Sequence, residues 1–196
     1  MKQHGFWRWF GLLGLVALLA ACSGHYLLDN QVQTFSRLPA TPAEPTYRHD
    51  RLPSQQGPAQ AQLEAMADSA LRKAGWRRDD TNARYTVQAS AQLQRVVSPW
   101  GWQGGGWTGF GLAHHGVGVM AGLPLMETPW HQRDVALIIR ELPSNAVVYE
   151  THASNSGPWL DPGVAFPAMF DAALQGFPTP PAGPRRVDIL LGGKAG

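Results

Sequence analysis

The clearest chemistry in this sequence belongs to Cys22, the only cysteine of the chain, and to the residues just before it. The run Leu19-Ala20-Ala21-Cys22 matches the bacterial lipobox, in which the cysteine thiol receives diacylglycerol and a signal peptidase then cleaves before the cysteine. The motif therefore predicts lipidation at Cys22. Cleavage there leaves a mature chain of 196 − 21 = 175 residues.

The segment before the lipobox has the organisation of an export signal. Lys2 and Arg8 give it a positive start, and residues 10–19 form an apolar run of ten residues. A membrane-spanning helix needs roughly 20 apolar residues, whereas a charged start, a short apolar run and small residues before the cut are typical of a signal peptide. We expect a lipoprotein signal peptide over residues 1–21; the alternative is an N-terminal membrane helix with an incidental cysteine.

Acylation at Cys22 predicts a permanent membrane anchor. About three acyl chains are attached in such lipoproteins, and each buried methylene contributes ~0.8 kcal/mol. Ser23 stands where an aspartate would favour retention in the inner membrane. We therefore expect the protein in the periplasmic leaflet of the outer membrane.

The composition of the mature chain excludes several classes of protein. Without Lys2 and Arg8, 16 − 2 = 14 basic residues face 14 acidic ones, so the net charge is near zero. The basic residues are scattered, unlike the basic stripe of a nucleic-acid-binding protein. With its single cysteine predicted to be lipidated, the chain forms no internal disulfide, and zinc sites built on cysteine pairs are excluded.

The sequence contains no recognisable catalytic or metal-binding motif. His114 and His115 are adjacent, and neighbouring residues of a strand point to opposite faces, so we expect no metal site there. No Gly-x-Ser-x-Gly, His-Glu-x-x-His or phosphate-binding glycine motif is present. We predict no catalytic residues, no metal and no cofactor.

Residues 96–126 form the most unusual part of the chain. These 31 residues include nine glycines and no Asp, Glu, Lys or Arg. We interpret them as a long loop insertion, because each glycine inside a helix costs ~1 kcal/mol relative to alanine. The loop either binds a partner or folds back to cover the sheet. The candidate partner-binding residues are its aromatic side chains: Trp100, Trp102, Trp107 and Phe110.

The remaining residues predict strands and helices around a single core. Apolar and polar residues alternate most clearly over 85–94, and helical spacing of apolar residues marks 63–74 and 166–177. Further strands are expected at 32–36, 46–52, 133–142, 146–154 and 185–191. This order predicts one α+β domain over residues 22–196: a mixed, mostly antiparallel sheet with two helices packed on one face. Leu137 and Phe170 are expected in its core.

The mature chain resembles a known family at residues 46–55, 133–140, 148–151, 167–178 and 181–187. In these segments it is similar to the proteobacterial lipoproteins grouped as domain of unknown function 4136, in which a lipobox, a Gly- and Trp-rich insertion and an α+β sandwich occur together. The family has no assigned catalytic residues, so the resemblance implies a fold and a cellular location only.

Two classes of function remain open. The first is a non-enzymatic envelope lipoprotein that binds or organises a partner. Its partners would be the membrane, reached through the acylated Cys22, and another envelope protein or peptidoglycan. The alternative is a hydrolase or transferase of envelope polymers whose catalytic residues are dispersed in the sequence. Convergence of polar side chains in a pocket would favour the second class.

Overall fold

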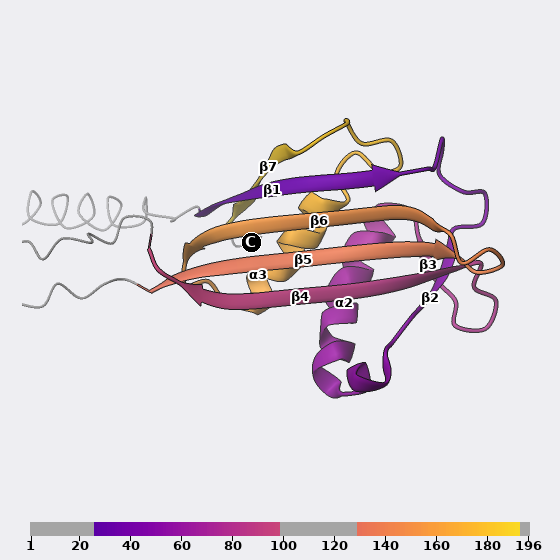
Figure 1. Ribbon diagram of the computed structural model, residues 1–196, viewed down its shortest axis with the longest axis horizontal. Coiled ribbons are helices and arrows are strands. Elements are labelled where there is room, and N and C mark those ends of the chain that lie inside the picture. Colours follow the sequence, from indigo (N-terminus) through magenta and orange to yellow (C-terminus); the bar gives the residue numbers. More distant parts are fainter. Residues whose placement is uncertain (1–25, 99–128, 193–196) are drawn as a thin grey trace, which may run out of the picture.

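The computed structural model describes residues 26–98 and 129–192. These residues form one sheet of seven strands in the order β3-β2-β4-β5-β6-β1-β7, with two helices on one of its faces (Figure 1). The strands are β1 (Tyr26–Ser36), β2 (Thr46–His49), β3 (Arg77–Arg78), β4 (Tyr85–Val96), β5 (Trp130–Glu141), β6 (Val147–Pro158) and β7 (Arg185–Leu191). The predicted fold class, α+β with a mixed sheet, is confirmed.

Most strand pairs are antiparallel, as expected. β4, β5, β6, β1 and β7 pair antiparallel in that order. The short strand β2 instead runs parallel to both β4 and β3. The strand expected over 46–52 is shorter in the structure, where β2 ends at His49. It lies second from the edge of the sheet, with β3 outside it.

The helices are α2 (Pro58–Lys73) and α3 (Pro162–Ala173), and a short 3-10 turn, η1 (Pro53–Gln55), precedes α2. Proline at the first position suits both helices, because its missing N–H has no partner in a first turn anyway. The Asp161 side chain accepts a hydrogen bond from the Gly163 backbone N–H at 2.7 Å and so caps α3. Gly75, with φ of +91°, follows the end of α2 at the predicted stop.

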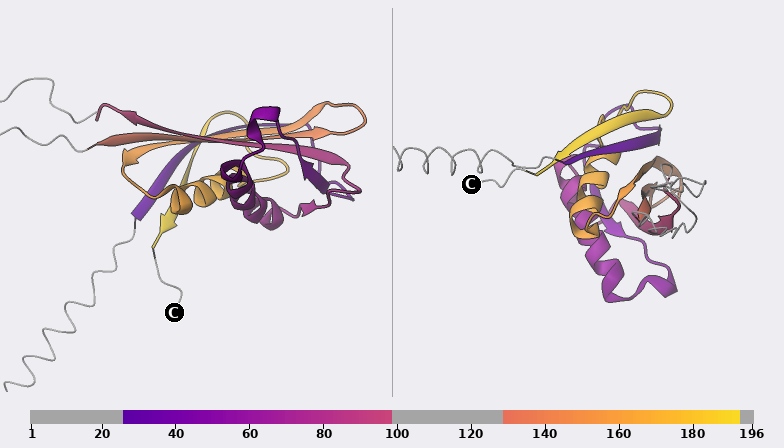
Figure 2. Two further views of the ribbon diagram at one scale, coloured as in Figure 1. Left: turned by 90° about the horizontal axis from the view of Figure 1, so that it is seen from below. Right: turned by 90° about the vertical axis from the view of Figure 1, so that its left-hand side faces the viewer.

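Both helices lie against the same face of the sheet (Figure 2). On that face alternate residues of β5 are fully buried, namely Val135, Leu137 and Ile139. The Thr151 hydroxyl of β6 donates to the Ala173 carbonyl at 2.8 Å, which satisfies a free carbonyl at the end of α3. No helix among the described residues is both long and apolar enough to span a membrane.

The predicted core residues Leu137 and Phe170 are both fully buried. Replacing either with alanine should lower the free energy of unfolding by ~3 kcal/mol, because apolar burial is lost and a cavity remains. Leu190→Ala is the control, since Leu190 is 61% exposed and should change stability little. Chemical denaturation of the three variants measures this. Equal stability of all three would contradict the packing described here.

Candidate functional site

The residues that the sequence singled out for chemistry lie outside the described part of the chain. These are Cys22, the loop aromatics Trp100, Trp102, Trp107 and Phe110, and the pair His114-His115. The structure does describe the residues on either side of these segments. Tyr26 begins β1, Val96 ends β4, and Trp130 begins β5.

These flanking residues all lie at one end of the sheet, which we call the loop end and define by Tyr26, Val96, Trp130 and Pro158. Val96 is directly opposite Trp130, and Trp130 is opposite Pro158 on the next strand. Tyr26 of β1 lies at the same end, because its hydroxyl oxygen is close to Gly157 of β6: a Cβ added at Gly157 would be 3.0 Å from that oxygen.

A buried arginine, Arg133, lies just inside the loop end. Its side chain is fully buried, and its Nη1 donates to the Asn155 side-chain oxygen at 3.0 Å. A second donor, Nη2, contacts the Pro158 carbonyl oxygen. Burial lowers the pKa of Arg133. Because Asn155 in turn donates to the Asp29 carbonyl at 2.7 Å, this polar chain joins β5, β6 and β1 just below the loop end.

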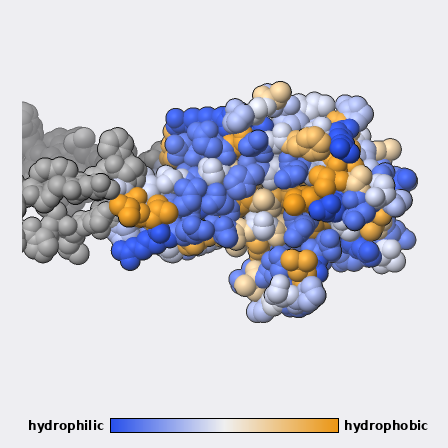
Figure 3. Space-filling view, viewed as in Figure 1, coloured by the Kyte–Doolittle hydropathy of each residue, from blue (hydrophilic) through white to orange (hydrophobic). Residues whose placement is uncertain are grey.

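The surface of the loop end is rich in exposed apolar side chains. Trp159 is 60% exposed, and its ring meets the His131 ring edge-on with centroids 5.1 Å apart. Val97 and Leu27 are also exposed. Figure 3 shows apolar residues on this face beside the grey segments. Tryptophan is frequent where an apolar environment meets water, because its large ring carries one polar N–H. This end of the sheet is therefore chemically suited to an interface.

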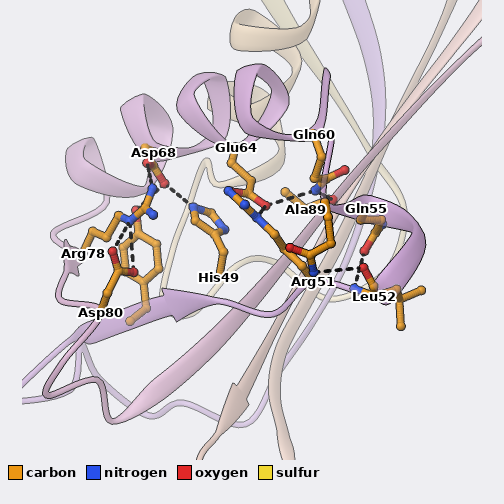
Figure 4. A network of polar contacts seen from close by, with 12 residues as sticks. His49, Arg51, Leu52, Gln55, Gln60, Glu64, Asp68, Arg78, Asp80 and Ala89 are labelled. Atoms are coloured by element: carbon orange, nitrogen blue, oxygen red, sulfur yellow. Dashed lines mark hydrogen bonds and ion pairs between the residues drawn. The ribbon is translucent and has the colours of Figure 1, made fainter. Parts of the chain in front are cut away.

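A second group of polar residues connects β2 to α2 (Figure 4). Asp68 of α2 accepts two hydrogen bonds at 2.7 Å on the same oxygen, one from the Tyr47 hydroxyl and one from His49 Nε2. Its other oxygen accepts from Arg78 Nη1 of β3 at 3.3 Å. Arg78 also pairs with Asp80. We call Tyr47, His49, Asp68 and Arg78 the Asp68 cluster.

Glu64, one helical turn before Asp68, is the fully buried carboxylate of α2. Its side chain is 1% exposed and receives both Arg51 Nε, at 2.7 Å, and Arg51 Nη2. Gln60 donates to the same carboxylate at 3.3 Å and to the Ala89 carbonyl of β4 at 3.1 Å. The helix is thereby joined to the segment after β2 and to β4.

The environment shifts the pKa values of these groups. Burial alone would raise the pKa of Asp68, but hydrogen bonds from His49 and Tyr47 outweigh burial and lower it. Burial likewise opposes ionisation of Glu64, and its pairing with Arg51 lowers the pKa nevertheless. The pKa of Tyr47 is raised, first by burial and then by its hydrogen bond to Asp68. The two carboxylates are therefore ionised and the phenol is protonated near neutral pH.

The polar side chains of this group form hydrogen bonds mainly with one another. Each carboxylate oxygen of Asp68 and Glu64 accepts at least one hydrogen bond from this chain. Such an arrangement holds α2 against β2 and β3. Among residues 26–98 and 129–192, no group of three or more His, Cys, Asp or Glu side chains is placed to hold a metal ion.

Sequence reasoning missed the Asp68 cluster. The strands expected from the sequence do not include Arg77–Arg78, whereas the structure pairs these two residues with β2 as strand β3. The available signal was the helical spacing of Glu64 and Asp68, which places two acids on one face of α2, together with polar residues that alternate along β2.

Comparison with known proteins adds information on the fold only. No model of a known protein family matches the chain. No curated protein matches it either.

The solved structures that match the chain include the following three. A PDZ domain protein from Parabacteroides distasonis has a TM-score of 0.51 at 10% identity, over 90% of this chain and 42% of that chain. The PelC dodecamer from Paraburkholderia phytofirmans has a TM-score of 0.47 at 14% identity, over 78% of this chain and 99% of that one. A PelC variant from the same organism has a TM-score of 0.45 at 14% identity, over 74% and 94%.

The Asp68 cluster predicts a defined acid sensitivity. A folded-state pKa below the unfolded value contributes stability at neutral pH, and that contribution is lost as the pH falls through the folded pKa. Asp68→Ala should lower the free energy of unfolding by about 2 kcal/mol at pH 7, because Tyr47 and His49 lose their acceptor. The difference from the parent chain should persist down to the ordinary pKa of aspartate, about 4. It should shrink only as the pH falls further, through the lowered pKa at which Asp68 of the folded parent chain is protonated.

Asp80→Ala is the matched control for this experiment, because it also removes a carboxylate bound by Arg78 but from an exposed position. Exposed ion pairs contribute at most about 1 kcal/mol. Urea unfolding at several pH values from 3 to 8 gives the comparison. A pH-independent difference for Asp68→Ala, or equal losses in the two variants, would contradict the role assigned to Asp68.

Proposed function

We propose that this protein is a lipid-anchored lipoprotein of the cell envelope that acts as a non-enzymatic binding or structural module. The observation that carries the proposal is the lipobox, Leu19-Ala20-Ala21-Cys22, after a short apolar run. Its place is the periplasmic leaflet of the outer membrane, and its class is that of the lipoproteins of domain of unknown function 4136.

The position of the anchor relative to the domain supports this proposal. Tyr26, the first residue of β1, follows Cys22 by only four residues. Since an extended chain spans at most ~3.6 Å per residue, Tyr26 lies within about 14 Å of the acylated residue. The loop end of the sheet would therefore lie close to the lipid surface, and the exposed side chains of Leu27, Val97 and Trp159 would lie near it as well.

The Gly- and Trp-rich segment is the binding element in this proposal. The strands that flank it, β4 and β5, end and begin at the loop end, which in this proposal is the end of the domain close to the membrane. Partners of this segment would be another envelope protein or peptidoglycan. The polar side chains of the Asp68 cluster bind one another, which supports a structural role for them.

The anchor is tested by Cys22→Ser. This variant should carry no fatty acid, because serine lacks the thiol that receives diacylglycerol, and it should stay as uncleaved precursor in the inner membrane or be released. Growth with a labelled fatty acid and fractionation of the envelope measure both effects. Ser23→Ala is the control and should be labelled like the parent chain. Label on the Cys22→Ser protein would refute the proposed anchor.

The binding element is tested by replacing residues 97–129 with Asn-Gly. Val96 and Trp130 are opposite each other in the register, so a two-residue turn can close this hairpin without changing the pairing of β4 with β5. We expect the melting temperature to be kept and envelope association beyond the lipid anchor to be lost. Pull-down with the lipidated protein and thermal melting measure the two properties.

The matched control for this replacement keeps the length of the segment and changes only its aromatic residues to alanine: Trp100, Trp102, Trp107 and Phe110. It should lose the same partners. A lower melting temperature with exposed apolar surface would instead show a segment that covers the sheet. An unchanged fold with unchanged association would leave the segment without either role.

A further inference from the structure

Strand β4 is paired completely on one side and only partly on the other. β5 lies along its whole length, from Tyr85 to Val96. On the opposite side, β2 reaches only Val87. Two further contacts extend this side slightly: the Asp50 backbone N–H donates to the Val87 carbonyl at 2.9 Å, and Gln60 donates to the Ala89 carbonyl. Among the described residues, no strand pairs with this side of β4 after Ala89.

The backbone groups that face this free side can be assigned. In an antiparallel pair the N–H and C=O groups of alternate residues point to the same side of the strand. Because the Val87 and Ala89 carbonyls point away from β5, those of Ala91, Leu93 and Arg95 do so as well. Ala91 is half-buried, while Leu93 and Arg95 are exposed. We call residues 90–96 the free edge of β4.

The free edge contains one charged residue, Arg95, and otherwise lacks the features that usually prevent strands from pairing. Natural sheets protect their edges with charged residues, proline or a bulge. From Gln88 to Gln94 β4 contains no charge and no proline, and its pairing with β5 is regular throughout. The other long edge of the sheet, β7, is different, since Arg185, Arg186 and Asp188 occur within seven residues. Within residues 26–98 and 129–192, therefore, the β4 edge is less protected by charge than the β7 edge.

We propose that the free edge of β4 pairs with the free edge of a second copy of this chain, antiparallel and about a two-fold axis at Leu93. An interface of this type uses the same surface on both subunits. In such a pair, residues whose backbone groups face the edge must be opposite one another. With the axis at Leu93, each residue whose carbonyl faces the free edge has a partner in the second copy. Leu93 is opposite Leu93, and Ala91 is opposite Arg95.

The side chains of the free edge fit this register. Leu93, a large apolar residue that is 37% exposed in one copy, lies against its counterpart and loses contact with water. Gln92 is opposite Gln94 of the second copy, so uncharged amides meet on the other face. Arg95 is opposite Ala91, which keeps the two arginines from facing each other, an arrangement that would be unfavourable. The pairing goes beyond the proposed function, because nothing in it depends on the lipid anchor.

The register is tested by cysteine substitution in the full-length protein. Residues in a hydrogen-bonded antiparallel pair have Cα atoms about 5.5 Å apart, which is a favoured distance for a disulfide. Leu93→Cys should therefore form a covalent dimer after mild oxidation. Ser90 is an exposed residue on the same strand. Ser90→Cys should give roughly tenfold less covalent dimer, because Ser90 of the second copy would lie about 20 Å away. Oxidised envelopes are analysed by non-reducing electrophoresis.

The proposed contact between Gln92 of one copy and Gln94 of the other is tested by two double variants at these exposed positions. Gln92→Lys with Gln94→Lys places like charges opposite each other and should make the protein monomeric, and Gln92→Glu with Gln94→Glu should do the same. A mixture of the two variants should form a dimer again. Sedimentation of the detergent-extracted proteins measures their mass. The parent chain should be dimeric with Cys22 intact and with Cys22→Ser.

Three results would overturn the proposal. One is a monomeric parent chain at the concentration found in the envelope. Another is cross-linking of Leu93→Cys to a different protein in place of a second copy. The third is a Cys22→Ser chain that no longer pairs, since the lipid would then be what brings the copies together.

Discussion

The organisation of this protein depends on one constraint, which is that apolar burial occurs on a single face of the sheet. Along β5, Val135, Leu137 and Ile139 are buried under the helices, whereas Asp134 and Ala136 point to the other face. A shift of the pairing by one residue would exchange the two faces and expose the whole apolar set. The register is therefore strongly fixed. The face that the helices leave uncovered is mostly polar, with smaller apolar patches (Figure 3).

The polar clusters are needed because α2 offers the sheet little apolar surface. Its buried apolar residues are two alanines and a leucine, and its other buried side chain is the carboxylate of Glu64. Hydrogen bonds to Arg51 and to the Asp68 cluster therefore supplement packing in holding this helix. A buried carboxylate is costly unless it is paired, so these contacts also define one position of α2 along β2. The single cysteine leaves no disulfide for this purpose.

The sequence predicted those elements that depend on local pattern. Alternation over 85–94 identified β4, and helical spacing identified α2 and α3. The first half of β1 was missed because its buried positions include Asn30, which is polar and breaks the apolar alternation. Asn30 is accommodated since its side-chain amide donates to the Val187 carbonyl at 3.1 Å, a partner 157 residues away. β3 and the Asp68 cluster were missed for the same reason, since distant contacts define them and local pattern does not.

The proposed lipid anchor and the proposed pairing of two β4 strands can occur in the same assembly. The axis at Leu93 lies only three residues from Val96, a distance of about 10 Å along the strand, so it is close to the loop end of each copy. A two-fold axis perpendicular to the paired sheets keeps the same face of both copies on one side. Each Tyr26 lies within about 14 Å of its Cys22, so both anchors can reach one lipid surface from that side. The paired sheets would then lie along the membrane, and two lipid anchors would hold them there together.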